Sequence, residues 1–194
     1  AAFGNGELYV EEFVRQARHV EVQILGDQQG NVIHLGEREC SVQRYFQKII
    51  EVAPAPGLAD ELRQRIIDAA VHLATSVSYS NAGTFEFLMD VSGHENNQPF
   101  SFIEANARLQ VEHTVTEEVT GVDIVKAQIH LAGGASIAEL GLDRADLATP
   151  RGYAIQARVC MESVLEDGSI VPTGGTLSAY EPPSGPGVRT DGFG

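Results

Sequence analysis

The two stretches that decide the fold are GTFEFLMD, at Gly83–Asp90, and FSFIEAN, at Phe100–Asn106. Both are rich in aromatic residues and alternate with the period of two that is typical of a β-strand. The polar segment 91–99 joins them, so the two stretches predict an antiparallel hairpin. Polar side chains in the middle of such apolar strands are the first candidates for a functional site.

Three side chains with oxygen atoms converge if these two strands pair. Glu86 lies mid-strand, and alternation places Phe102, Glu104 and Asn106 on one face of the second strand. Two carboxylates buried side by side repel each other and lose hydration. A hard divalent cation such as Mg²⁺ or Mn²⁺ would remove both penalties and prefers oxygen ligands. The alternative is that each carboxylate faces solvent or pairs with an arginine, and the spacing leaves both interpretations open.

The hydrophobic pattern on either side of this hairpin predicts an α+β fold. Strict alternation indicates strands. From Leu58 the period changes, and an apolar stripe with helical spacing from Leu62 to Val77 indicates a helix. A second helix is expected to open at Thr116, to break near Gly121 and to resume over Asp123–Ala132. The further predicted strands are Leu8–Phe13, His19–Leu25, Val32–Leu35, Gln47–Val52, Tyr153–Met161, Gly175–Tyr180 and Gly187–Asp191.

Composition and charge restrict the class of protein. The chain has 194 residues, 43% of them hydrophobic, and a formal net charge of −14. This length can bury a core, whereas the acidity argues against a nucleic-acid partner and no apolar run reaches the roughly 18 residues of a membrane span. The widely spaced Cys40 and Cys160 are interpreted as reduced thiols of a cytoplasmic protein. The two ends of the sequence lead us to expect a fragment.

Further polar residues lie outside the central hairpin. Arg108 could hold an oxyanion such as carbonate or phosphate, and Glu112 could act as a general base. The spacing slightly favours the simpler alternative that these two residues pair with each other. Lys48, one of only two lysines, is either an oxyanion ligand at a strand edge or a solvated side chain. His19, Glu21 and Gln23 form the polar face of the strand His19–Leu25, which either lines the floor of a cleft or, as is more common for such a face, is exposed to solvent. Arg189 alone indicates only a surface turn.

Several motifs together resemble biotin carboxylase and occur in that family's order along nearly the whole chain. They are RHVEVQ at Arg18–Gln23, ERECSVQR at Glu37–Arg44, Gln47–Lys48, APAP at Ala53–Pro56, GTFEF at Gly83–Phe87 and IEANARLQVEHTVTE at Ile103–Glu117. The resemblance implies an ATP-grasp fold, here its second half, with an antiparallel sheet and flanking helices. Residues 1–7 would end the lid of that fold, residues 8–149 would form its central ATP-binding region, and residues 150–194 would begin the β-rich biotin carboxylase C-terminal domain.

The resemblance also implies a reaction. ATP activates bicarbonate as carboxyphosphate, and the carboxyl group then passes to the ureido nitrogen of biotin on a carrier domain. The cofactors would be ATP and Mg²⁺ or Mn²⁺, with biotin as substrate. The partners would be bicarbonate, the biotinylated carrier domain and the other domains of an acyl-CoA or pyruvate-type carboxylase. The family's N-terminal domain and lid lysines have no counterpart in this sequence, so we expect the isolated chain to be inactive.

The family's functional residues correspond to positions of this chain. Glu112 matches the general base, and Arg108 matches the residue that holds the carboxyphosphate. Arg189 matches the arginine that contacts biotin, and Lys48 would be a further catalytic side chain. The bicarbonate pocket matches Lys48, Arg108, Gln110, Val111 and Glu112, and the metal ligands match Glu86, Glu104 and Asn106. The ATP site matches Glu11, Glu12, Phe13, Val14, His19, Gln43, Phe46, Lys48, Glu86, Leu88 and Glu104.

Two departures and two alternatives accompany this interpretation. Tyr45 and Phe46 stand where many relatives have a basic residue followed by histidine, and Glu12 stands where some have lysine. One alternative is another ATP-grasp ligase of the carbamoyl-phosphate or purine-pathway type, against which the run Arg108–His113 speaks. The other is a non-catalytic structural fragment.

Overall fold

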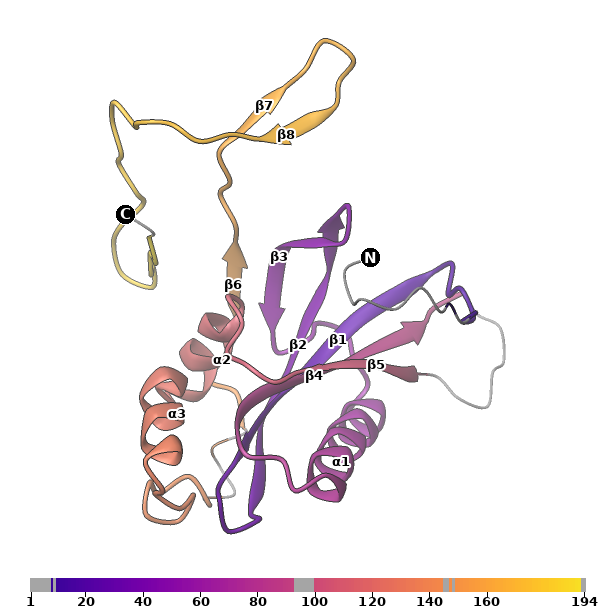
Figure 1. Ribbon diagram of the computed structural model, residues 1–194, viewed down its shortest axis with the longest axis vertical. Coiled ribbons are helices and arrows are strands. Elements are labelled where there is room, and N and C mark those ends of the chain that lie inside the picture. The colour runs from indigo at the N-terminus through magenta and orange to yellow at the C-terminus, as the bar shows by residue number, and fades with distance from the viewer. Residues whose placement is uncertain (1–7, 9, 93–99, 145–146, 148, 193–194) are drawn as a thin grey trace. The chain divides into compact units, whose positions relative to one another are not determined.

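The computed structural model describes residues 8, 10–92, 100–144, 147 and 149–192 (Figure 1). The chain divides between Arg158 and Val159 into two compact units. The first unit continues to Arg158 because a short strand after Pro150 joins its sheet. The domain boundary that the sequence predicts at residues 149 and 150 stays a prediction.

The first unit is built on a six-stranded antiparallel sheet. Its strand order is β5-β4-β1-β2-β3-β6, so the predicted hairpins β1–β2 and β4–β5 share one sheet and β1 lies between β4 and β2. In chain order the strands are β1 (Ala17–Gly26), β2 (Val32–Arg44), β3 (Gln47–Ala53), β4 (Asn81–Asp90), β5 (Phe100–Asn106) and β6 (Ala154–Ala157).

Helices pack against the apolar parts of both faces of the sheet. The helix α1 (Asp60–Ser76) buries Ile66 and Ala70 against the apolar residues of β1 and β4, such as Val22 and Phe87. On the other face, α3 (Ile124–Ala132) packs against the far ends of β1, β2 and β4. The helix α2 (His113–Thr120) lies beside β2, β3 and β6. The middle of this second face is left for the polar side chains of β1 and β4, because successive residues of a strand point to opposite faces.

A bulge in β5 corrects one prediction made from alternation. Glu86 pairs with Glu104 and the next residue, Phe87, pairs with Phe102, so Ile103 is an extra residue in the edge strand. Alternation predicts that Phe102 and Glu104 share a face, but in the structure they lie on opposite faces. The ring centroid of Phe102 lies 5.7 Å from that of Phe87. An inserted residue reverses the alternation beyond it.

Other element boundaries also differ from the predictions. The helix α2 begins at His113 rather than at Thr116, whose side chain is buried. No strand forms at the described residues of Leu8–Phe13, where the predicted strand is wrong. Cys40 and Cys160 are not joined in a disulfide, as expected. Among the described residues, no helix is long and apolar enough to cross a membrane.

The second unit contains one small hairpin. Its strands are β7 (Glu162–Val164) and β8 (Ile170–Pro172), which pair antiparallel. The strands predicted at Gly175–Tyr180 and Gly187–Asp191 are wrong, because neither segment forms ladder hydrogen bonds in the structure. Alternation alone cannot make a strand without a partner strand beside it.

Candidate functional site

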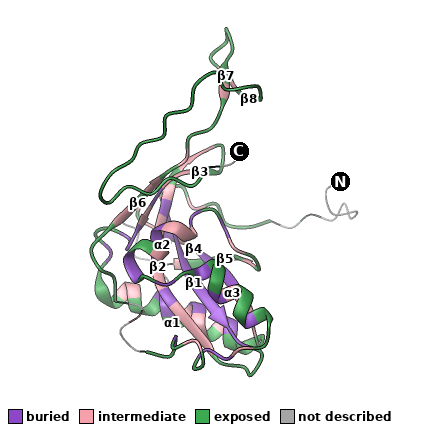
Figure 2. Cartoon of the chain, turned by 90° about the vertical axis from the view of Figure 1, so that its left-hand side faces the viewer, coloured by how far each residue is buried: buried purple, intermediate pink, exposed green. Residues whose placement is uncertain are grey.

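The polar face of the sheet carries a buried cluster of charged side chains. Its members come from neighbouring strands and from the segment between β5 and α2, whose Gln110 and Glu112 contact side chains of β4 and β3. The strand β1 is almost wholly buried on both faces (Figure 2). The prediction that the polar face of β1 is solvent-exposed is therefore wrong, since Glu21 and Gln23 are 0% and 1% exposed. The cluster comprises His19, Glu21, Gln23, Arg38, Lys48, Glu51, Thr84, Glu86, Gln110, Glu112, Thr116 and Arg158.

Lys48 joins three carboxylates at the centre of the cluster. Its Nζ lies 2.5 Å from Glu21 Oε2, 2.6 Å from Glu112 Oε1 and 2.9 Å from Glu86 Oε1. Burial alone would lower the pKa of Lys48, but the charges of Glu21 and Glu112 outweigh burial and raise the pKa above its usual range. The ammonium group is thus charged at all physiological pH values, and the solvated alternative for Lys48 is excluded.

Glu86 is the most heavily hydrogen-bonded of these carboxylates. Its Oε1 accepts from Lys48, from Asn106 Nδ2 at 2.8 Å and from Gln110 Nε2 at 3.0 Å, and its Oε2 lies 2.7 Å from His19 Nε2. Burial alone would raise the pKa of Glu86, but these contacts outweigh burial and hold the pKa well below its usual range. Glu86 is therefore an ionised carboxylate with partners on both oxygens.

Arg38 forms the floor of the cluster. The side chain is completely buried and donates to Glu21 Oε1, to Gln23 Oε1 at 2.9 Å and to Thr84 Oγ1 at 3.1 Å. It also donates to Thr116 Oγ1 at 3.1 Å, which links the sheet to α2. A fully buried guanidinium requires a carboxylate and several acceptors to offset its lost hydration.

Glu112 is clamped between two cations. Its Oε1 accepts from Lys48 and its Oε2 from Arg158 Nη2 at 2.7 Å, whereas the predicted alternative, a pair with Arg108, does not form. Burial would raise the pKa of Glu112, but Lys48 and Arg38 outweigh burial and lower the pKa. Arg158 also binds Glu51, in which burial outweighs the arginine and raises the pKa.

The proposed metal ligands meet at the edge between β4 and β5. Asn106 Nδ2 donates to Glu86 Oε1 and, at 3.1 Å, to Glu104 Oε1, so one amide bridges two carboxylates. A hard cation binds carboxylate and amide oxygens, and a rotation of the Asn106 amide by 180° would present its oxygen in place of the nitrogen. The side chains present therefore fit Mg²⁺ or Mn²⁺.

The structure places the other predicted site residues in different surroundings. Gln43 Nε2 lies 2.7 Å from His19 Nδ1, which brings these two together at the border of the cluster. Of the remaining predicted residues of the first unit, Leu88 and Val14 are half-buried, and Phe46, Arg108, Val111, Glu11, Glu12 and Phe13 are exposed. Arg189 belongs to the second unit, where its Nε lies 2.9 Å from Asp191 Oδ2.

Four charged members of the cluster were missed as site residues from the sequence. Glu21, Arg38, Glu51 and Arg158 each lie within a strand or directly after one, among apolar neighbours. That placement is the signal that could have identified them, as it did for Glu86. Their convergence depends on the strand order, in which β6 joins the edge of β3 after a long excursion of the chain.

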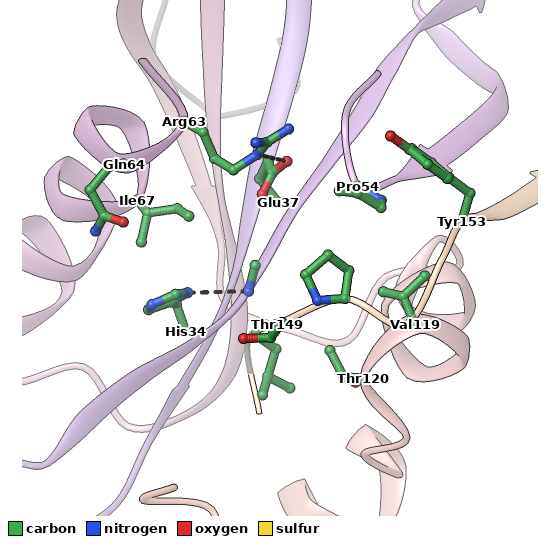
Figure 3. Close-up of a pocket in the computed structure, with 13 residues that line it drawn as sticks. His34, Glu37, Pro54, Arg63, Gln64, Ile67, Val119, Thr120, Thr149 and Tyr153 are labelled. Carbon is green, nitrogen blue, oxygen red and sulfur yellow. Dashed lines mark hydrogen bonds and ion pairs between the residues drawn. The ribbon is translucent and has the colours of Figure 1, made fainter. Parts of the chain in front are cut away.

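A cavity of about 470 Å³ lies apart from this cluster, between β2, α1 and the end of α2 (Figure 3). Two of its polar side chains have partners within the lining: Arg63 Nε donates to Glu37 Oε1 at 2.8 Å, and His34 Nδ1 accepts from the backbone of Gly36. Burial lowers the pKa of His34, so the ring is neutral at pH 7. None of the predicted site residues lines this cavity, and the charged cluster remains the candidate site.

Comparisons with known proteins agree with this fold. The chain belongs to the family described as the carbamoyl-phosphate synthase L chain, ATP binding domain, whose model matches residues 1–140. It is 52% identical over 192 residues to pyruvate carboxylase of Aspergillus terreus and 51% identical to that of Staphylococcus aureus, matching 99% and 98% of this chain. The chain spans only about 15% of the length of these relatives.

Solved structures of carboxylases are also similar to this chain. A variant of Rhizobium etli pyruvate carboxylase with the allosteric activator acetyl coenzyme A matches with a TM-score of 0.86 and 48% identity, over 97% of this chain and 16% of that one. A complex of biotin carboxylase with β,γ-ATP from Campylobacter jejuni matches with a TM-score of 0.82 and 42% identity, over 95% of this chain and 38% of that one. The predicted resemblance to biotin carboxylase and its ATP-grasp fold is confirmed.

Proposed function

We propose that this chain is part of a biotin carboxylase that uses MgATP and bicarbonate to carboxylate biotin on a carrier domain. The observation that carries the proposal is the contact between the half-buried ammonium group of Lys48 and the buried carboxylate of Glu112, whose pKa is lowered. Such a pair can bind a small oxyanion and accept its proton. The likeness to pyruvate carboxylases and biotin carboxylases over nearly the whole chain supports the same conclusion.

In the first step, a bicarbonate oxygen attacks the γ-phosphorus of ATP, the bond from that phosphorus to the β,γ-bridging oxygen breaks, and ADP leaves. Glu112 takes the bicarbonate proton, and Lys48 holds the resulting anion. Gln110 and Val111 would line the bicarbonate pocket, and the exposed Arg108 would screen the carboxyphosphate. Phosphoryl transfer depends on alignment and charge neutralisation of this kind more than on covalent catalysis.

Glu86, Glu104 and Asn106 would hold the divalent cation. The bound ion supplies charge neutralisation at the phosphate oxygens. This requirement agrees with the charge of the cluster itself, because its four carboxylates outnumber its three permanent cations. The carboxylates are Glu21, Glu51, Glu86 and Glu112, and the cations are Lys48, Arg38 and Arg158. An anionic nucleotide therefore needs a further positive charge at this place.

The remaining roles rest on the correspondence with the family. ATP would contact the segment Glu11–Val14 together with His19, Gln43, Phe46 and Leu88, and Arg189 would meet biotin in the C-terminal domain that begins at residue 150. Residues 8–149 would be the central ATP-binding region and residues 1–7 the end of its lid; residues 1–7 lie outside the described residues. The whole protein would act in the cytoplasm with its carrier and other carboxylase domains, and this chain alone would show negligible ATP cleavage.

The test is Glu112→Gln in the full-length protein that contains this chain, with bicarbonate-dependent ATP cleavage as the measurement. We expect a loss on the order of 100-fold to 10,000-fold, because the variant keeps the side-chain shape but cannot accept the proton. Glu61→Gln, an exposed carboxylate of α1, serves as the matched control and retains full activity. Unchanged turnover in Glu112→Gln refutes the base assignment, and ATP cleavage that free biotin does not stimulate refutes the biotin carboxylase assignment.

A further inference from the structure

Every N–H group of the Arg38 guanidinium has an acceptor in the structure. The side chain is 0% exposed and carries five N–H groups. Nε donates to Glu21 Oε1, Nη1 to Gln23 Oε1 at 2.9 Å and to Thr116 Oγ1 at 3.1 Å, and Nη2 to Thr84 Oγ1 at 3.1 Å and to Gln110 Oε1 at 3.5 Å. Arg38 therefore has no N–H left with which to bind a substrate, and it acts on other side chains.

Two of these acceptors lie outside the sheet, on either side of the predicted base. Gln110 belongs to the segment between β5 and α2, and Thr116 lies in the first turn of α2, so Glu112 stands between them in the chain. They are 72 and 78 residues away from Arg38 in the sequence. The other three acceptors belong to β1 and β4. One buried side chain of β2 thus joins the segment Gln110–Thr116, which carries the proposed bicarbonate pocket, to the sheet.

The neighbours of Gln110 determine which end of its amide faces each of them. A guanidinium can only donate, so the amide oxygen must face Arg38. The ionised carboxylate of Glu86 can only accept, and it takes an N–H from Gln110 Nε2 at 3.0 Å. A reversed amide would place its oxygen against a carboxylate and its nitrogen against a cation. The amide nitrogen is therefore held on the side of Glu86.

This orientation gives Gln110 a donor for an anion. Its Nε2 carries two N–H groups, one of which Glu86 accepts, and the other has no acceptor among the described residues. Gln110 is only 7% exposed, so few water molecules can compete for this second N–H. An oxyanion would accept a hydrogen bond from it, whereas an amide oxygen at the same place would repel the anion.

Stability alone does not explain a guanidinium at this place. The carboxylate of Glu21, which contacts Arg38, also lies 2.5 Å from the ammonium nitrogen of Lys48. Removing a guanidinium from water is unfavourable, and replacing buried ion pairs with apolar residues often leaves stability unchanged or improves it. An apolar side chain, however, could not hold Gln110 and Thr116 in fixed directions. The arrangement is therefore better explained by the positions that it gives these two residues.

We propose that Arg38 is a positioning residue for bicarbonate, which holds the segment Gln110–Thr116 on the sheet and keeps the amide nitrogen of Gln110 turned toward the bound anion. The inference rests on the proposed function, since it requires Gln110 to line the bicarbonate pocket. Without Arg38 the amide can rotate, and its oxygen can then face the anion in place of an N–H. The loss of one hydrogen bond to a charged group lowers affinity by roughly 10-fold to 100-fold.

The experiment compares Arg38→Lys with the matched control Arg151→Lys, an exposed arginine, in the full-length protein. Lysine keeps the charge that pairs with Glu21, but its compact ammonium group cannot reach all five acceptors. Steady-state ATP cleavage is measured while bicarbonate and ATP are varied separately. We expect Arg38→Lys to raise the KM for bicarbonate on the order of 10-fold to 100-fold and to leave the KM for ATP unchanged. A general loss of structure would instead affect both substrates.

A double-mutant cycle with Gln110→Ala shows whether Arg38 acts through Gln110. Gln110→Ala removes the amide that Arg38 orients. We therefore expect the double variant to have the same KM for bicarbonate as Gln110→Ala alone. A further increase in the double variant, as large as that caused by Arg38→Lys in the parent protein, overturns the inference.

Thr116→Val keeps the experiment decisive even if circular dichroism shows that Arg38→Lys does not fold. Valine has a shape similar to that of threonine but offers Arg38 no acceptor. Thr120→Val is the matched control in the same helix, because the hydroxyl of Thr120 bonds only to nearby backbone groups. We expect Thr116→Val to raise the KM for bicarbonate by roughly 10-fold and the control to keep the parental value.

The outcomes separate the inference from the proposed function. A parental KM for bicarbonate in folded Arg38→Lys or in Thr116→Val overturns the inference alone, as does an equal increase in the KM for ATP. Absence of bicarbonate-dependent ATP cleavage in the unmodified full-length protein overturns the proposed function and with it the inference.

Discussion

Replacing Lys48 with methionine tests the electrostatic design of the cluster. Methionine keeps most of the apolar length of the side chain and removes only the charge that Glu21, Glu86 and Glu112 share. At an effective dielectric constant of about 20, opposite unit charges at such separations attract by roughly 6 kcal/mol per pair before dehydration is subtracted. Removing one partner from a buried pair has a net cost of about 3–5 kcal/mol. We therefore expect Lys48→Met to lower the free energy of unfolding by about 4 kcal/mol at pH 7.

The loss should depend on pH in a direction that the pKa values determine. In the parent chain the pKa values of Glu86 and Glu112 lie below their ordinary value of 4.5. Both groups therefore add stability above that pH, and this contribution is lost as the pH falls through the lowered values. Without Lys48, burial and mutual repulsion favour the protonated form of the carboxyl groups. Protonation therefore removes the repulsion between the carboxylates of the variant as the pH falls from 7 towards 4.5. The deficit of the variant must shrink over this range.

Urea unfolding followed by far-UV circular dichroism at several pH values measures both effects. Lys126→Met is the matched control, because Lys126 is the other lysine of the chain and is exposed on α3. We expect the control to change the free energy of unfolding by less than about 0.5 kcal/mol at every pH. A deficit below about 1 kcal/mol in Lys48→Met, the range of surface ion pairs, would refute the reasoning, as would a deficit that does not change with pH.

Two further predictions concern the backbone. A Cβ on Gly26 would lie 2.2 Å from the carbonyl oxygen of Tyr79, so Gly26→Ala should lower the free energy of unfolding by about 2–3 kcal/mol. Gly174 has open space around it, so Gly174→Ala should change this free energy little. Equal effects of the two variants in urea unfolding would contradict the prediction. Tyr45 is 81% exposed and has a positive φ of 50° in the turn between β2 and β3. Asparagine tolerates this backbone conformation better than tyrosine, so Tyr45→Asn should raise the thermal midpoint of unfolding and add about 1 kcal/mol of stability. A lowered midpoint would contradict this prediction.

Local patterns predicted the elements whose partners are close in the sequence. The period of two identified both strands of the β4–β5 hairpin and the period of 3.6 identified α1, which begins two residues after the predicted Leu58 and ends one before Val77. The bulge at Ile103 was not predicted, because one inserted residue leaves no pattern in the local sequence and is visible only in the pairing with β4. The segments near the C-terminus alternate as well as true strands do, but alternation does not supply a partner strand.

The site was predictable only in part, for a related reason. Glu86, Glu104 and Asn106 stand out as polar residues within one apolar hairpin, and the structure brings them together as predicted. The polar face of β1 looked solvent-exposed because nothing in its own sequence shows that another segment covers it. Burial of Glu21 is imposed by Arg38 from β2 and Lys48 from β3, at separations of 17 and 27 residues.

The geometry of Lys48 also indicates which of its contacts a substrate anion can replace. A bicarbonate ion that approaches the ammonium group must displace a carboxylate, and the separations of 2.5, 2.6 and 2.9 Å make Glu86 the most weakly held of the three. Glu86 also keeps partners in Asn106, Gln110 and His19 when Lys48 leaves it, whereas Glu21 retains only Arg38 among the cations in contact with it. Release by Lys48 leaves Glu86 Oε1 with two neutral amide donors, Asn106 and Gln110, and with no cation, at the place where the proposed metal ion would bind. Exchange of the Lys48–Glu86 contact would therefore serve anion binding and cation binding together, and an acidic chain can accept an anionic substrate without a net positive surface.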